Sequence, residues 1–487
     1  MRTSNRSTAV NALARSLALA LAGVVLTDGS GAAAATPMRI RDLPAAPRQT
    51  HAGPTPAGSN LVVTNCADSG PGSLRQAMLD ARNNTIIDFR QLQCSTITLT
   101  TGALTDPDTD SLQLVATPAI VSGRPQPTVT INGGDASRII EHRSGGHLEL
   151  TGIALANGRS TAGKGGCLYS IGHITLTAVT VSNCSSVATG SSAALGGGIW
   201  SDDQVDLLYS TVSGNVALAN TGGYSYGGGV FSSYGVYSLF STVQGNRATG
   251  FGYGGGVSVV GYASLRSSTI NANTAAYGGG LALFSGGTGP GDFRIRNSTI
   301  ASNHATGFAA GIEVIGSLTI HNSTIALNVS DHANTATIAA GVMMEGTHQL
   351  TLVSSIVARN TQGGVAHDVG GFGTIDGSAN LVMSSSLTLP AGTLTSDPML
   401  NVFGNYGGQT NLLGLKPGSP AINAGSNPLN TLCDQRGGTL TPSFGMTGIY
   451  QRVAGNAPDI GAFEYAAGDL LFADGFEEVA LYSCYPT

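Results

Sequence analysis

The chain has 487 residues, of which 10% are charged, 41% are hydrophobic and 70 are glycine, and its net charge is −6. Such low charge and high glycine content argue against ordinary globular domains and favour an all-β solenoid, in which neighbouring coils cover most of the surface. No segment combines low hydrophobicity with high net charge, which argues against disorder. The negative net charge provides no basic surface for nucleic acid, so we expect no nucleic-acid partner.

The N-terminus predicts a secretory signal over residues 1–35. Arg2, Arg6 and Arg15 form a basic start, residues 16–26 are apolar, and Ala33-Ala34-Ala35 offers a cleavage site. The apolar run is too short to span a bilayer, and no later segment is longer, so we expect no transmembrane segment after signal removal. A retained anchor is the alternative. Residues 36–60 are rich in proline and alanine and predict a flexible linker.

Residues 61–164 predict an N-terminal cap and the first coils, with one short amphipathic helix over 71–79. Exposed strand edges at the ends of a solenoid need such a cap.

A glycine triplet followed by an aliphatic residue recurs through the middle of the chain, and its full copies begin at Gly196, Gly227, Gly254 and Gly278. Each copy precedes a Ser-Thr-Val/Ile-x-x-Asn element, and the aligned threonines 180, 211, 242, 269, 299 and 324 lie 25 to 31 residues apart. This period suits a coil of three short strands, and neither a leucine ladder nor a helical period is present. The repeat therefore predicts a right-handed parallel β-helix over residues 165–380, with about seven coils between 165 and 360.

Period-2 alternation assigns two aliphatic stacks to the interior. The first is expected to contain Ile199, Val230, Val257, Leu281, Ile312 and Val342, and the second Val212, Val243, Ile270, Ile300 and Ile325. We expect the recurrent asparagine to adopt left-handed backbone at a turn and to form a hydrogen-bonded ladder with its neighbours. Cys184 takes the asparagine position in its coil, which is consistent with a disulfide at one side of the stack.

Six cysteines suit an oxidising compartment, and fifteen pairings are open to them. Proximity in sequence favours three pairs: Cys66–Cys94, Cys167–Cys184 and Cys433–Cys484. Metal ligation is the alternative, but no C-x-x-C spacing or nearby Cys/His cluster supports it.

Several motifs resemble those of secreted β-helix families. Residues 65–77 are similar to the N-terminal motif of bacterial β-helix surface proteins, and the coils resemble polymorphic outer-membrane-protein and pectate-lyase-type repeats. Residues 381–465 resemble the choice-of-anchor Q domain, through the segments 397–398, 405–408, 417–425, 434–437 and 459–464. Asn423 departs from this pattern, because aspartate is commoner there, and 438–451 resembles an insertion. Residues 466–487 contain a segment similar to a tail of exported proteobacterial proteins. The resemblances imply the fold and an extracellular or cell-surface location.

Catalytic β-helix proteins that act on polysaccharides place acidic side chains on neighbouring coils, and glycosidases need two carboxylates about 5–10 Å apart. The outward positions after the triplets form two columns, and neither column has acids on consecutive coils. The columns read Trp200, Phe231, Ser258, Ala282, Glu313, Met343 and Asp202, Ser233, Val260, Phe284, Ile315, Glu345. Asp202 and Glu313 remain the candidate catalytic residues. Asp202, Asp203 and Asp206 are interpreted as a solvated turn.

No cofactor or metal is expected. The acids of residues 106–110 have the spacing of a calcium loop, but the sequence lacks the glycine and the glutamate that such a loop requires. The histidines suggest no catalytic triad from their order.

Aromatic residues form the other candidate site. Tyr226, Tyr253 and Tyr277 precede consecutive triplets and predict a ladder that either binds sugar faces, if exposed, or fills a corner of the core, if buried. Trp200 over Phe231 is a second pair, with an outward phase. Arg266, Arg296 and His321 share a register and form either a stripe for an acidic glycan or a solvated edge.

These features predict a secreted or cell-surface monomer that binds polysaccharide or cell-surface glycan without catalysis, as an adhesin does. One alternative is a polysaccharide lyase or glycoside hydrolase of pectate-lyase-like fold. Another is a structural envelope component without a ligand.

Overall fold

The computed structural model describes residues 58–465 except 107–110, 190–191, 221, 286–291, 334, 336 and 441–445, and it also describes Cys484. The predicted signal over 1–35, most of the linker over 36–60 and the tail over 466–487, apart from Cys484, lie outside the described residues. So does most of the calcium-like loop over 106–110.

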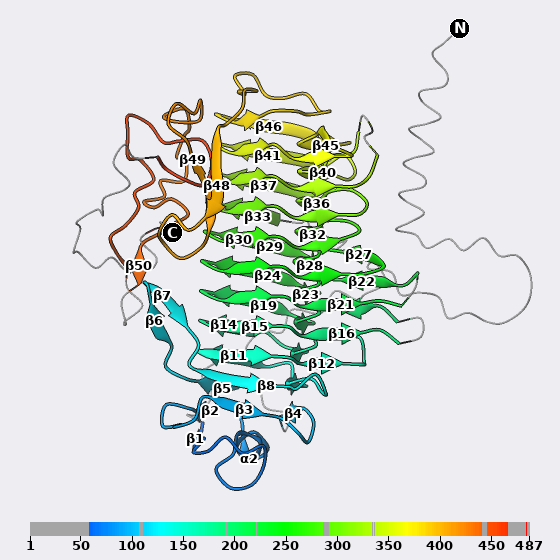
Figure 1. Ribbon diagram of the computed structural model, residues 1–487, viewed down its shortest axis with the longest axis vertical. Helices are drawn as coiled ribbons and strands as arrows, with labels where there is room; N and C mark the ends of the chain where they lie inside the picture. Colours follow the sequence, from blue (N-terminus) through cyan, green and yellow to red (C-terminus); the bar gives the residue numbers. More distant parts are fainter. Residues whose placement is uncertain are drawn as a thin grey trace, which may run out of the picture.

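The described chain winds into a parallel β-helix, which confirms the predicted all-β fold (Figure 1). The middle coils each contribute one strand to each of four stacked sheets, one more strand per coil than the sequence predicted. Sheet 1 has twelve strands: β1 (Asn60–Val62), β2 (Thr85–Asp88), β5 (Ser111–Val115), β10 (His147–Thr151), β14 (Ile174–Thr177), β19 (Gln204–Leu208), β24 (Gly235–Leu239), β29 (Tyr262–Arg266), β33 (Asp292–Arg296), β37 (Ser317–His321), β41 (Gln349–Val353) and β46 (Thr374–Ser378).

The other three sheets follow sheet 1 around the coil. Sheet 2 contains β3 (Thr96–Thr98), β8 (Val129–Asn132), β11 (Ile153–Ala156), β15 (Thr180–Ser182), β20 (Thr211–Ser213), β25 (Thr242–Gln244), β30 (Thr269–Asn271), β34 (Thr299–Ala301), β38 (Thr324–Ala326), β42 (Ile356–Ala358) and β47 (Leu381–Val382). Sheet 3 contains β12 (Arg159–Ser160), β16 (Ser185–Val187), β21 (Val216–Leu218), β26 (Arg247–Ala248), β31 (Thr274–Ala275), β35 (His304–Ala305), β39 (Val329–Ser330), β43 (Thr361–Gln362) and β44 (Val365–Ala366). Sheet 4 contains β4 (Leu104–Thr105), β9 (Ile140–His142), β13 (Leu168–Ser170), β18 (Ile199–Ser201), β23 (Val230–Ser232), β28 (Val257–Val260), β32 (Leu281–Phe284), β36 (Ile312–Ile315), β40 (Val342–Met344) and β45 (Val369–Gly371).

Short strands complete the described part. A three-stranded sheet of β17 (Ala194–Leu195), β22 (Tyr224–Tyr226) and β27 (Phe251–Tyr253) lies on the connections between sheets 3 and 4. Three hairpins join β6 (Ala119–Val121) to β7 (Arg124–Gln126), β48 (Leu400–Gly404) to β49 (Leu412–Leu415), and β50 (Thr439–Leu440) to β51 (Met446–Thr447).

Both predicted aliphatic stacks lie in the core. The members of the first stack are at most 2% exposed, and those of the second at most 1%. In register, Ile199 pairs with Val230 and Val212 with Val243, so identical positions cover each other from coil to coil. Full burial of such a side chain contributes about 1.5–3 kcal/mol, which makes this interior the main source of stability.

The glycine triplets allow the coils to approach closely. Gly196 has a φ of +58°, a left-handed conformation that glycine adopts without steric cost. A Cβ on Gly197 would lie 2.2 Å from the carbonyl oxygen of Gly228 on the next coil. A larger residue at Gly197 would therefore push neighbouring coils apart, and one at Gly196 would clash with the carbonyl of Ile199 in its own coil.

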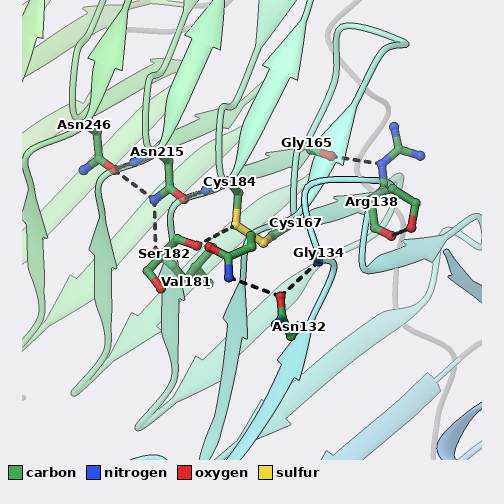
Figure 2. The surroundings of a disulfide bond; sticks show 12 residues. Asn132, Gly134, Arg138, Gly165, Cys167, Val181, Ser182, Cys184, Asn215 and Asn246 are labelled. Carbon is green, nitrogen blue, oxygen red and sulfur yellow. Dashed lines mark hydrogen bonds between the residues drawn. A yellow bond between two sulfur atoms is a disulfide. The ribbon is translucent and has the colours of Figure 1, made fainter. Parts of the chain in front are cut away.

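A buried asparagine ladder runs through six coils, as predicted, and Figure 2 shows its start. The backbone N–H and Nδ2 of Asn215 both donate to Oδ1 of Asn246, at 3.0 and 2.9 Å. The same pair of bonds links Asn246, Asn273, Asn303, Asn328 and Asn360 in turn. The predicted left-handed backbone is wrong for these asparagines: the residue before each takes that conformation, as in Gly214 and Gly245.

The ladder begins at Cys184, whose N–H donates to Oδ1 of Asn215 at 2.9 Å. Cys184 is disulfide-bonded to Cys167 beside the ladder (Figure 2). The other two disulfides are Cys66–Cys94 and Cys433–Cys484, so the structure pairs all six cysteines as proximity in sequence suggested.

The N-terminal cap contains the predicted helix as α2 (Leu74–Asp80). Ser73 caps it by accepting a hydrogen bond from the N–H of Gln76. Leu74, Ala77 and Met78 face the first coils and are buried. Among the described residues, no helix is long and apolar enough to cross a membrane.

The C-terminal region, drawn orange to red in Figure 1, lies along one side of the solenoid instead of extending it. Asn297 donates to the carbonyl of Cys433 at 2.8 Å, and Asn322 donates to that of Ser426 at 2.9 Å. Thr299 donates to Oε1 of Gln435 at 2.6 Å. Residues 411–462 therefore dock on the corner between sheets 1 and 2 and on the outer face of sheet 2.

Asp434, Arg436 and Glu464 of the motif segments form a buried ion network together with Arg452, which lies outside those segments. Arg452 pairs with Glu464 at 3.1 Å, and both side chains are at most 1% exposed. Arg436 pairs with Asp434 at 2.7 Å, and its guanidinium lies 4.1 Å from the ring centre of Tyr450. These residues hold the region together and are not available to a ligand.

Candidate functional site

Of the predicted aromatic residues, Trp200 and Phe231 lie on the outer face of sheet 4, whereas Tyr226, Tyr253 and Tyr277 lie on the connections that precede its strands and pack against that face. Trp200, Phe231, Tyr226 and Tyr253 are 1–7% exposed, and Tyr277 is half-buried. The connections that carry β17, β22 and β27 turn back over this face and shield it. Trp200 and Phe231 thus have the predicted outward phase, but their rings are shielded from solvent.

The tyrosine ladder does form. The ring centres of Tyr226 and Tyr253 are 5.3 Å apart, those of Tyr253 and Tyr277 are 5.0 Å apart, and those of Tyr277 and Phe308 are 4.7 Å apart. Burial raises the pKa of the Tyr226 and Tyr253 hydroxyls. This arrangement favours the structural alternative, in which the rings fill a second core and contribute about 0.5–1.5 kcal/mol per pair.

The two candidate catalytic acids lie apart. Asp202 is partly exposed, and its Oδ1 accepts a hydrogen bond from Ser233 at 2.6 Å. Glu313, four coils further along in β36, is 1% exposed. The structure therefore does not bring Asp202 and Glu313 together.

Glu313 instead has an acidic neighbour that the sequence columns did not reveal. Its carboxyl group lies close enough to that of Glu345, which follows β40 on the next coil, for the two to interact electrostatically, and Oε2 of Glu313 is buried without a hydrogen-bond partner. Burial raises the pKa of Glu313 well above its ordinary value, and the neighbouring Glu345 raises it further. Burial also raises the pKa of Glu345 to about 7. Because two carboxylates at close range repel each other, the protonated form of one of them is favoured.

The two columns of outward positions do not reveal this pair, because Glu313 and Glu345 are diagonal neighbours on adjacent strands. Glu313 is in register with Met343, and Glu345 lies two residues beyond Met343 on the same side of the strand. Alignment along each column separates the two acids, whereas diagonal neighbours on one sheet face lie within reach of long side chains. With Glu345 at 5% exposure, the pair is closed to a large substrate in this structure.

The open polar surface lies on sheet 1. Its outward side chains are partly exposed along β10, β14, β19, β24 and β29, and five of them form a network, defined here as the strip: His147, His173, Gln204, Asp206 and Tyr262.

The strip is continuous across five coils. Nε2 of His147 lies 2.9 Å from Oγ1 of Thr175, and the His147 ring stacks on that of His173 at 4.6 Å. Nε2 of His173 lies 3.0 Å from Oδ2 of Asp206. Oδ1 of Asp206 accepts from Nε2 of Gln204 at 2.5 Å. Oε1 of Gln204 in turn accepts from the hydroxyl of Tyr262.

Gly235 makes the last link possible. It lies between Gln204 and Tyr262 in register, and a Cβ there would lie 2.3 Å from the Tyr262 ring. Because no side chain occupies this position, the Tyr262 ring lies over the backbone of β24. Tyr234 meets it edge-on, with ring centres 5.5 Å apart.

The predicted basic stripe borders the strip. Arg266, Arg296 and His321 are in register at the ends of β29, β33 and β37 and are partly exposed. Burial and the charge of Arg296 lower the pKa of His321. The face thus has carboxylate, imidazole and phenol groups towards the N-terminal coils and guanidinium groups further along.

The sequence contains a signal for the strip one strand after the positions that follow the glycine triplets. Those positions lie on sheet 4, whereas the equivalent positions of the next strand place His173 and Gln204 in adjacent coils. The sequence suggested a solvated turn for Asp206, but this residue lies within β19 and belongs to the strip.

Comparisons with known proteins yield a weak structural likeness and no family. No family model matches the chain, and no curated protein matches it. A solved structure described as the crystal structure of pectate lyase Pel9A matches with a TM-score of 0.38 and 15% identity, over 83% of this chain and 97% of that chain. The chain is a parallel β-helix protein. The resemblance of residues 381–465 to the choice-of-anchor Q domain stays a prediction.

Among the described residues, no group of three or more His, Cys, Asp or Glu side chains could hold a metal ion.

Proposed function

We propose that this protein is an extracellular glycan-binding protein and that the strip on sheet 1 is its binding surface. The continuous network from His147 to Tyr262 is the observation that carries this proposal. It presents donors and acceptors on four of five successive coils, which lie about 4.8 Å apart, along a surface that the C-terminal region and the connections leave open. Sugar hydroxyls need such mixed donors and acceptors along an extended chain.

The network also holds these groups in place. The carboxylate of Asp206 is fixed by both His173 and Gln204, so the strip is ordered before a ligand arrives. Pre-organisation lowers the entropic cost of binding. The three disulfides support the proposed location, since disulfides persist in oxidising compartments.

Glycan arrays and affinity electrophoresis with the purified full chain test the proposal. Loss of a hydrogen bond to a charged group costs about 1.5–3 kcal/mol. We therefore expect His173→Ala to weaken binding at least about tenfold. Tyr262→Phe removes the hydroxyl and keeps the ring, so it should weaken binding less than Tyr262→Ala. Thr180→Ala, on the outer face of sheet 2, is the matched control.

Absence of binding to any glycan, or equal binding by the His173→Ala and Thr180→Ala variants, contradicts the proposal. Substitution of Trp200 or Phe231 is not a test of binding, because both rings are buried and their removal would perturb the fold.

Cleavage of a polysaccharide is the second candidate function, favoured by the contact between Glu313 and Glu345 on adjacent coils. It requires the covering connections to open. Release of reducing ends from a polysaccharide by the wild-type chain, and its loss in Glu313→Gln, would support it. No product across acidic and neutral polysaccharides would count against it.

A further inference from the structure

A cleft opens where three distant segments meet. It lies between the β6–β7 hairpin, the corner that joins sheets 1 and 2, and the C-terminal region. Its empty volume is about 570 Å³, part of which is open to solvent. The floor includes Tyr209 and Phe240, whose ring centres are 5.3 Å apart. Most of the lining is polar and none of it belongs to the strip.

Arg124 of β7 lines this cleft and has no acidic partner among the described residues. Its Nε donates to the carbonyl of Gly408 at 2.8 Å, and its Nη2 donates to Oδ1 of Asn405 at 3.0 Å. A longer bond of 3.4 Å joins Nη1 to Oδ1 of Asn411. All three acceptors are neutral. Burial lowers the pKa of Arg124, as expected for a cation whose charge nothing nearby compensates.

The guanidinium is therefore fixed but not neutralised. A guanidinium has five N–H donors, and these contacts use three of them. The remaining donors suit a carboxylate, which pairs with arginine through charge-assisted hydrogen bonds. An anion in the cleft would complete the contacts of Arg124.

The rest of the lining suits hydroxyl groups. Thr211 and Thr242 are in register on the outer face of sheet 2, and Gln244 follows Thr242 on the same face. Oε1 of Gln409 is buried without a hydrogen-bond partner, while its amide donates to the carbonyls of Gly123 and Gly438. A buried acceptor without a partner is costly, and a ligand hydroxyl could satisfy it.

We propose that this cleft binds a small polyhydroxylated carboxylate, the chemistry of a sugar acid. The carboxylate pairs with Arg124, and the ligand hydroxyls bond to Thr242, Gln244 and Gln409. The site shares no residue with the strip, so it stands whether or not the strip binds a glycan.

Isothermal titration calorimetry of the full chain with glucuronate and with glucose tests the proposal, because these sugars differ at the carboxylate. We expect glucuronate to bind at least about tenfold more tightly than glucose, the factor that corresponds to about 1.4 kcal/mol. Arg124→Gln should abolish this preference. Arg247→Gln removes an exposed arginine from β26 with the same change of charge and should leave binding unchanged.

Thr242→Val provides a second variant in case Arg124→Gln releases the hairpin. It keeps the guanidinium and should weaken both sugars by the same factor. His173→Ala should not change glucuronate binding, which separates this site from the strip. Equal binding of the two sugars, no binding of either, or an unchanged preference in a folded Arg124→Gln variant overturns the proposal.

Discussion

Replacing Glu345 with glutamine should change how the stability of the protein depends on pH. In the folded chain, burial raises the pKa of Glu345 to about 7 from an ordinary value of 4.5. Between these two pH values the folded state holds a proton that the unfolded state has lost. The free energy of unfolding therefore falls as pH rises through this window, and it levels off above the folded pKa.

The size of the effect follows from the width of the window. Each pH unit between the two pKa values costs about 1.4 kcal/mol, so ionisation of Glu345 removes about 3 kcal/mol of stability between pH 4.5 and pH 8. Glutamine keeps the size and the hydrogen-bonding capacity of the side chain but does not titrate. Relative to the wild type, Glu345→Gln should gain about 3 kcal/mol over the same range.

Urea unfolding at pH 4.5 and pH 8 measures the global change. Amide exchange of peptides that contain β36 and β40 measures the local one, because solenoids can open by segments. Asp376→Asn, at an exposed carboxylate on β46, controls for the loss of a charge. If the difference between Glu345→Gln and the wild type is the same at both pH values, the reasoning is wrong.

Two further substitutions probe what holds the scaffold. Asn273→Ala leaves the carbonyl of Val243 and the donors of Asn246 without partners in the interior, so the free energy of unfolding should fall by about 3 kcal/mol. Equal urea midpoints for this variant and for Gln244→Ala, a substitution at an exposed residue, would contradict this prediction. Arg452→Met leaves the carboxyl of Glu464 buried without its cation, at a cost of about 3–5 kcal/mol. In limited proteolysis of this variant, the C-terminal region should be cleaved at earlier times than the solenoid. If its cleavage is the same as in Arg143→Met, a substitution at an exposed residue, the ion pair does not hold the C-terminal region in place.

Much of the fold was readable because the chain repeats. The positions of Gly197 and Val212 are repeated once in every coil. Each copy therefore gives the same local evidence for a close approach of neighbouring coils and for an inward-pointing side chain. The backbone of the asparagines was mispredicted for a local reason. Asparagine tolerates left-handed backbone, but here its side chain must point inward to bond the next coil, and the residue before it takes the turn.

The candidate sites were harder to predict because they depend on contacts between strands. Trp200 has the phase of an outward residue, yet the connections that contain β17, β22 and β27 cover it. Period-2 alternation within a strand cannot predict that another segment of the chain will cover an outward side chain. The contact of Glu313 with Glu345 is diagonal. The strip depends on Gly235, an absent side chain whose effect appears only when β19, β24 and β29 lie side by side.

The asparagine ladder has a direction and an end. The N–H and Nδ2 of Asn360 donate to Oδ1 of Asp368, both at 2.8 Å, and the other oxygen of Asp368 accepts from Ser384. An amide both accepts and donates, so each asparagine passes the pattern to the next coil, whereas an ionised carboxylate only accepts. A new repeat with one asparagine, inserted between Cys184 and Asp368, would be joined to the ladder at both ends. Beyond Asp368 the same repeat would find no side-chain donor, because the backbone N–H of Asp368 is the donor that remains and it bonds to Ser384, so the side-chain ladder ends at this residue.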